Sequence, residues 1–174
     1  MNHPLEDKTQ RHWHALYTRS RYEKRVADEI QKKGIQAYLP LTRILRRWSD
    51  RKKWVDEPLF RSYVFIQGNS IERYRSLQTT GVVRMVEFQG KPAIVPEEEI
   101  DRIKRILKEG ECVEPCDAIS IGDRVSIVRG PLLGIEGRLI EIQGRSRLVV
   151  SVESINQALR LCVSRSDVRI LNKK

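Results

Sequence analysis

Short apolar runs alternate with amphipathic segments along the first part of the chain. Residues 12–17 are rich in aromatic side chains and too few for a helix, so they predict a β-strand. Tyr22, Val26 and Ile30 then recur every fourth residue among charged ones, which predicts a helix with one apolar stripe that ends at Gly34. The pattern therefore predicts a domain that mixes strands and helices.

Polar residues stand at the expected helix starts. Ser20 and Glu23 have the spacing of a capping box, which predicts that the first helix starts at Ser20. Asn69 or Ser70 is placed to cap a second, short helix. Acidic residues after Pro96 are typical of the first turn of a third helix.

The remaining apolar runs predict further strands and a basic hairpin. Three runs have the length and residue types of strands: residues 36–41, 63–67 and 82–88. Residues 43–55 carry many basic side chains on both sides of Ser49 and Asp50, which predicts a basic hairpin that turns there. Together these elements predict an α+β domain over residues 12–110, an antiparallel sheet packed with helices.

After residue 110 no helical period remains. Residues 111–117 contain a proline and no period, so they predict a linker. Short alternating runs separated by glycines then have the layout of a small closed β-barrel. These runs are residues 124–128, 138–142, 148–152, 158–163 and 168–171. The chain is thus predicted to end in an all-β barrel over residues 118–172.

The charge of the chain points to the class of partner. The 33 Lys and Arg residues exceed the 23 Asp and Glu residues, giving a net charge of +10, while 40% of the residues are hydrophobic. A basic surface of this kind favours a polyanion, with nucleic acid first among them. The alternative is that the charge only keeps the protein in solution.

No pattern indicates a metal site, a cofactor or a catalytic centre. Cys112 and Cys116 lack a second Cys or His pair at zinc spacing, and together with Cys162 they predict reduced thiols in a cytoplasmic protein. No apolar run approaches the roughly 20 residues of a membrane span. We therefore expect a monomer that has no cofactor and is not an enzyme.

Residues 121–137 resemble the KOW motif, a strand–turn–strand unit of NusG-type factors and some ribosomal proteins. Gly130 and Pro131 form a sharp turn in such a unit, and Gly134 and Gly137 permit positive φ or close backbone approach. A KOW unit alone indicates a protein linked to nucleic acid or the ribosome.

The N-terminal half makes the resemblance more specific. Residues 57–66 resemble the central strand of the NusG N-terminal domain, and residues 81–88 with 92–96 resemble the strand and loop that follow it. Because order and spacing agree, residues 12–171 resemble a NusG/RfaH-type transcription elongation or antitermination factor.

The resemblance implies that the first domain docks on the clamp of the largest RNA polymerase subunit through an apolar patch. Carried over by position, the patch consists of Tyr17, Phe60, Tyr63, Phe65, Met85 and Phe88. Tyr63 and Phe65 share one face of a strand, and buried aromatics commonly anchor an interface. The alternative is that this face packs on the domain's own helices.

Basic residues near the first helix are candidates for contact with DNA. Arg19, Arg21 and Arg25 border the helix start, where related factors touch the non-template DNA strand in the transcription bubble. The alternative is that these arginines do not bind DNA and only form a solvent-exposed face of the helix. Trp48 and Trp54 of the basic hairpin could likewise stack on nucleic acid, or they could pair across the strands.

For the barrel, the resemblance implies a small-subunit ribosomal protein or a termination factor as partner, with Ile155 at the position of the key apolar residue. The equally open alternative is that Ile155 lies at the barrel edge as part of the fold. Residues 72–75 depart from the RfaH-type patch that contacts the opposite polymerase pincer. The resemblance favours an operon-specific paralogue, and the rival function is a ribosome-associated or RNA-binding KOW protein.

Overall fold

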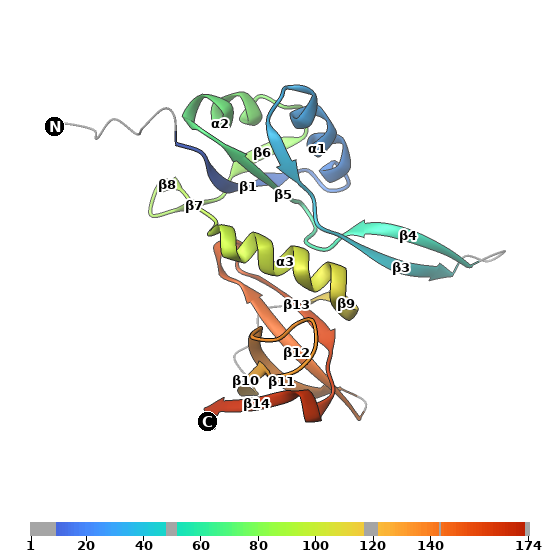
Figure 1. Cartoon of the computed structure of the whole chain (residues 1–174). Coiled ribbons are helices and arrows are strands. Elements are labelled where there is room, and N and C mark those ends of the chain that lie inside the picture. Colours follow the sequence, from blue (N-terminus) through green and yellow to red (C-terminus); the bar gives the residue numbers. More distant parts are fainter. Residues whose placement is uncertain (1–9, 48–51, 117–121, 143, 173–174) are drawn as a thin grey trace. The chain divides into compact units, whose positions relative to one another are not determined.

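The computed structural model describes residues 10–47, 52–116, 122–142 and 144–172. Its contacts divide the chain into two compact units (Figure 1). The first unit consists of Met1–Pro40 and Phe60–Glu98, and the second of Leu41–Leu59 and Glu99–Lys174. Unlike the expected boundary at residue 110, this division groups the basic hairpin and most of the third helix with the C-terminal strands.

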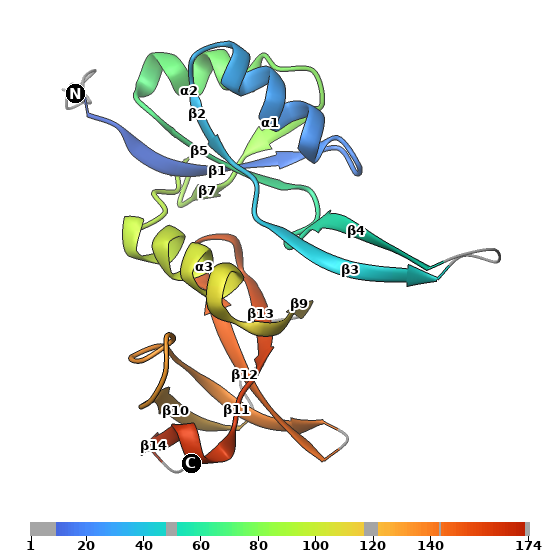
Figure 2. The same cartoon turned by 45° about the vertical axis from the view of Figure 1, so that its right-hand side comes forward.

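The first unit is a four-stranded antiparallel sheet with helices on one side (Figures 1 and 2). The strand order is β2 (Gln36–Tyr38), β5 (Tyr63–Gly68), β1 (His12–Thr18) and β6 (Val82–Met85). The helices are α1 (Glu23–Lys32) and α2 (Ser70–Leu77). Val26 and Ile30 of α1 are buried in one cluster with Leu16, Val64 and Ile66 of the sheet. The four-residue apolar period thus correctly predicted the inner face of α1.

The second unit contains a six-stranded antiparallel sheet, a hairpin and a helix. The sheet order is β14 (Val168–Asn172), β10 (Asp123–Ile127), β11 (Glu136–Ile142), β12 (Arg145–Val152), β13 (Gln157–Cys162) and β9 (Glu111–Cys116). Among the described residues no pairing joins β14 to β9, so the structure shows a sheet with two edges where a closed barrel was predicted. We call these six strands the KOW barrel, after the predicted domain. The hairpin pairs β3 (Leu41–Arg47) with β4 (Lys52–Pro58), and helix α3 spans Glu97–Glu109. Two single turns of 3-10 helix complete the unit, η1 (Glu153–Ile155) and η2 (Arg165–Asp167).

Two segments differ from the sequence predictions. Residues 111–116, predicted as an irregular linker, form strand β9, which pairs with β13 at the edge of the sheet. The predicted strand 82–88 is interrupted after Met85, because β7 (Glu87–Phe88) turns back to pair with β8 (Lys91–Pro92). The predicted hairpin turn at Ser49 and Asp50 lies outside the described residues.

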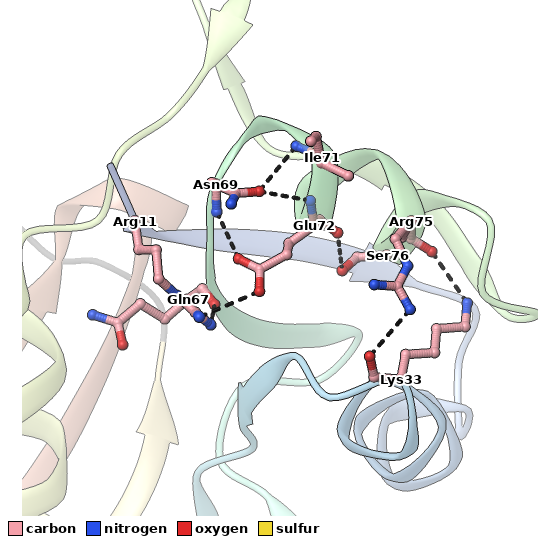
Figure 3. A network of polar contacts seen from close by, with 8 residues as sticks. All are labelled: Arg11, Lys33, Gln67, Asn69, Ile71, Glu72, Arg75 and Ser76. Carbon is pink, nitrogen blue, oxygen red and sulfur yellow. Dashed lines mark hydrogen bonds and ion pairs between the residues drawn. The ribbon is translucent and has the colours of Figure 1, made fainter. Parts of the chain in front are cut away.

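The two predicted helix caps have opposite outcomes. Asn69 caps α2, since its side chain accepts from the amides of Ile71 and Glu72 while Glu72 accepts from the Asn69 amide (Figure 3). The Ser20 capping box is wrong. Helix α1 begins at Glu23 without a side-chain cap, and the Glu23 carboxylate instead accepts from the amide of Ser62 at 2.7 Å.

Further polar contacts fix the two ends of α2 (Figure 3). Arg11 forms an ion pair with Glu72 at 3.3 Å. At the other end the Lys33 ammonium donates to the Arg75 carbonyl, and the Arg75 guanidinium donates to the Lys33 carbonyl. These contacts connect α2 to Lys33, at the end of α1, and to Arg11, the residue before β1.

The glycines of the KOW segment behave as predicted. Gly130 and Gly134 have φ values of 80° and 85°. A Cβ atom on Gly137 would lie 2.3 Å from the carbonyl oxygen of Val149 on the neighbouring strand. Positive φ at the turn and close approach in the sheet therefore explain these three glycines.

Candidate partner-binding surface

One face of the sheet in the first unit carries a layer of aromatic side chains. Val64 and Ile66 of β5 belong to the core with α1, so Tyr63 and Phe65, which alternate with them along the strand, point to the opposite face. Tyr17 on β1 lies directly across from Tyr63, and the two rings meet edge to face with centroids 5.4 Å apart. Strand alternation thus separates the helix-covered core from the aromatic face.

The layer continues through successive ring contacts. Tyr38 stacks on Phe65 at 6.3 Å, and Phe60 meets the Phe65 ring edge to face at 6.4 Å. Trp13 meets Tyr38 edge to face at 6.5 Å. Trp13, Phe60 and Phe65 are buried, and burial raises the pKa of the Tyr38 hydroxyl to about 12. This part of the layer belongs to the interior of the protein.

The other end of the layer is accessible. Tyr17 and Tyr63 are both half-buried. The guanidinium of Arg84, which lies opposite Tyr17 on β6 and is exposed, stands 5.3 Å from the centre of the Tyr17 ring. We call Tyr17, Tyr63 and Arg84 the tyrosine edge. Its rings offer apolar area, and its guanidinium offers hydrogen-bond donors to a carboxylate or carbonyl.

The predicted docking residues therefore fall into four groups. Tyr17 and Tyr63 lie at the accessible end of the aromatic face, while Phe60 and Phe65 are buried within it. Met85 does not lie on that face, because its side chain is buried in the core with α1.

Phe88, the last of the predicted residues, is 71% exposed on the small hairpin of β7 and β8. No described ring contact joins it to the aromatic layer. It is accessible, but it is a feature separate from the tyrosine edge.

Sequence reasoning missed Trp13, Tyr38 and Arg84. Trp13 shares the two-residue alternation of β1 with Tyr17, so that pattern could have placed it on the same face. Arg84 comes close to Tyr17 only because β6 pairs with β1, and no local pattern shows that pairing.

The three predicted DNA-contacting arginines are all exposed: Arg19 and Arg21 lie in the turn between β1 and α1, and Arg25 lies in the first turn of α1. Arg21 has a left-handed backbone with φ of 66°. Arg25 on α1 donates to Glu29 at 2.9 Å, and this hydrogen bond and charge raise the pKa of the Arg25 guanidinium. Two of the three side chains are thus more available to a phosphate than the third.

Neighbouring loops hold this turn in place. The amide of Arg19 donates to the carbonyl of Gly81, and the amide of Thr18 donates to the carbonyl of Ser62, each at 2.8 Å. With the bond from Ser62 to Glu23, the start of α1 is joined to two other loops. These hydrogen bonds therefore fix the backbone of the turn that carries Arg19 and Arg21.

Of the two tryptophans of the basic hairpin, Trp54 lies within the described residues. Trp54 is 54% exposed, pairs with Leu45 across the strands, and has the Arg43 guanidinium 5.7 Å from its ring centre. Trp48 lies outside the described residues. The described part of the hairpin therefore shows the cross-strand arrangement and leaves the Trp54 ring partly open.

Ile155 of the KOW barrel is 4% exposed, within η1. Of the two placements considered above, the structure has the buried one. The carboxyl of Glu99 on α3 has a raised pKa because it is buried, although the neighbouring Ser154 and Glu153 oppose the rise. Helix α3 thus contacts the turn that contains Ile155.

Comparison with known proteins identifies the family to which this chain belongs. The family model described as "Transcription termination factor nusG" matches residues 11–104, more than half of the chain. The chain belongs to the NusG family. That match covers the whole sheet of the first unit and the predicted docking and DNA-contacting residues.

Similarity to individual NusG proteins extends into the C-terminal part. The chain is 26% identical to the transcription termination/antitermination protein NusG of Lactococcus lactis over 161 residues, 84% of this chain and 85% of the relative. It is 29% identical to NusG of Streptococcus pyogenes serotype M3 over 147 residues, 75% and 80% of the two chains. As a NusG-family member the chain is a transcription factor, and the family is not enzymatic.

A solved NusG structure has the same fold. The structure reported as "Domain interaction in Thermotoga maritima NusG" superimposes with a TM-score of 0.58 at 26% identity, covering 95% of this chain and 99% of that one. Its coverage includes residues of both units. Among the described residues, no helix is long and apolar enough to cross a membrane.

Proposed function

We propose that this NusG-family chain binds the largest-subunit clamp of a transcribing RNA polymerase and suppresses pausing or termination. The observation that carries the proposal is the tyrosine edge, where Tyr17, Tyr63 and Arg84 remain accessible on a sheet whose other face is filled by α1. Tyrosine and arginine are among the commonest interface anchors. Family membership supports polymerase as the partner.

The mechanism needs no chemistry by the factor. A protein that binds the elongating conformation of polymerase more tightly than the paused one shifts the population toward elongation by its difference in affinity. Each additional contact that exists only in the elongating complex strengthens that shift.

Replacing Tyr63 with alanine tests the docking surface. We expect Tyr63→Ala to weaken binding to purified elongation complexes by about 2 kcal/mol, roughly thirtyfold, because an aromatic anchor is lost. Equilibrium binding of the full chain gives this value. Tyr74→Ala is the matched control, since Tyr74 is 65% exposed on α2 and away from the aromatic face.

Equal affinities of the two variants would contradict docking through the tyrosine edge, provided that Tyr63→Ala remains folded by circular dichroism. If the wild-type chain co-purified with ribosomal subunits and not with polymerase, the rival function as a ribosome-associated KOW protein would replace the proposal.

For the basic turn we propose contact with the displaced non-template DNA strand. Arg19 and Arg21 present exposed guanidinium groups on a backbone fixed by neighbouring loops, and Arg25 extends the same surface. Contacts to phosphates would position the factor without reading sequence.

Removing Arg19 should weaken binding only where that DNA strand is present. We expect Arg19→Ala to lose about 1 kcal/mol, roughly fivefold in affinity, on complexes with the displaced strand, and the loss should shrink as salt rises. Arg25→Ala should lose less, because that side chain is already bound to Glu29. Arg129→Ala, exposed in the second unit, is the control. Equal losses with and without the strand would contradict the DNA contact.

We further propose that the chain is an operon-specific member of the family and that its KOW barrel binds a small-subunit ribosomal protein or a termination factor. The resemblance of residues 57–66 to RfaH-type factors supports the first point. For the second, the burial of Ile155 means that a partner must reach a surface of the barrel other than this side chain, or must open its contact with α3.

A further inference from the structure

Two cysteines and an arginine gather where β9 joins the edge of the KOW barrel. Cys162 on β13 lies opposite Glu111 of β9 on one side and opposite Arg147 of β12 on the other. The Arg147 guanidinium donates to the sulfur of Cys162. The residue after Glu111 is Cys112, which brings the second cysteine to the same end of the strand pair.

The backbone turns the Cys112 thiol toward this cluster. Cys112 has a left-handed φ of 52°, and the pairing of β9 with β13 shifts in register between Arg160 and Cys162. The Cys162 thiol and the Arg147 guanidinium are the neighbours that most affect the pKa of the Cys112 thiol, so the three groups form one cluster. The three cysteines are not joined by disulfides in the structure.

The two thiols have different surroundings. Cys112 is exposed, and hydrogen bonds from Cys162 and then from Arg147 hold the pKa of its thiol below the ordinary value. Cys162 is less exposed, and burial raises the pKa of its thiol. An exposed thiol of lowered pKa next to a less exposed second thiol is the arrangement of an attacking and a resolving cysteine.

We propose that Cys112 and Cys162 form a reversible disulfide on reaction with a low-molecular-weight disulfide such as glutathione disulfide. The Cys112 thiolate attacks one sulfur of glutathione disulfide, whose S–S bond breaks and releases one glutathione thiolate. Cys162 then gives up its proton and attacks the Cys112 sulfur, which releases the second glutathione. The protein loses two electrons and two protons, and one glutathione disulfide becomes two glutathione molecules.

The disulfide would hold β9 on the barrel covalently. In the reduced protein β9 is kept there by its ladder with β13 and by the ion pair of Glu114 with Arg160 at 2.8 Å. Because β9 directly follows α3, oxidation would remove the freedom of this segment to separate from β13. The proposed disulfide is therefore a redox-controlled crosslink between the edge strand β9 and β13.

Incubation of the full chain with glutathione disulfide tests the proposal. We expect the loss of two of the three free thiols, an intramolecular Cys112–Cys162 peptide by mass spectrometry, and full reversal by dithiothreitol. Cys116→Ser, which removes the remaining cysteine of β9, is the matched control and should form the same disulfide.

Single variants separate the two roles. Cys162→Ser should stop at a glutathione adduct on Cys112, because no second thiol can resolve it, whereas Cys112→Ser should keep Cys162 unmodified. Three thiols that persist in the wild type, a disulfide that includes Cys116, or covalent dimers in place of the internal disulfide would overturn the proposal.

Discussion

Replacing Ile155 with aspartate is expected to lower the melting temperature of the chain by more than about 10 °C. The side chain is 4% exposed within η1, so aspartate would place a carboxylate without a partner in the barrel interior. An unpaired buried charge, together with the lost apolar contacts, costs about 4 kcal/mol or more.

The control is Leu133→Asp, because Leu133 is 55% exposed in the same unit. Its melting temperature should stay close to that of the wild type, since exposed substitutions usually change stability by less than about 0.5 kcal/mol. Thermal unfolding followed by circular dichroism measures both variants. Similar melting temperatures would mean that Ile155 is accessible in solution and available to a partner.

The second large effect is expected at Gly137. The added methyl group of Gly137→Ala would meet the Val149 carbonyl oxygen at 2.3 Å and a Leu148 methyl carbon at 3.0 Å. The obstacle is backbone in a paired strand, so relief requires β11 and β12 to move apart. We expect a loss of about 3 kcal/mol in the free energy of unfolding, at the upper end of overpacking effects.

Denaturant unfolding measures this loss. Ser151→Ala, an exposed position on the neighbouring strand β12, adds no atoms and should change stability little. If the two alanine variants unfolded at the same denaturant concentration, the close approach at Gly137 would not exist in solution.

The two capping boxes show how far local sequence could predict the fold. The Ser20 and Asn69 segments have the same spacing to a glutamate, yet only Asn69 and Glu72 form the box. Glu23 instead binds the amide of Ser62, which is distant in sequence. Strand β9 was missed for a related reason, because an edge strand held by β13 needs no apolar period of its own.

The candidate site was predictable in its residue types but not in its exposure. The resemblance and the alternation of β5 placed Tyr63 and Phe65 on one face, as the structure has them. Which of them stays accessible depends on the rings of Tyr38 and Phe60 that pack on Phe65. Those contacts join separate segments, so a single strand's sequence cannot show them.

The alternation of β5 also limits how this protein can change during evolution. Val64 faces the helix-covered core and Tyr63 faces outward, one residue apart. An insertion or deletion of one residue within the strand would send every following side chain to the opposite face, exchanging aliphatic core for aromatic layer in one step. A point substitution disturbs only one of the two faces. The strand is therefore expected to diverge by substitution at fixed length, while insertions and deletions should be confined to the loops around it.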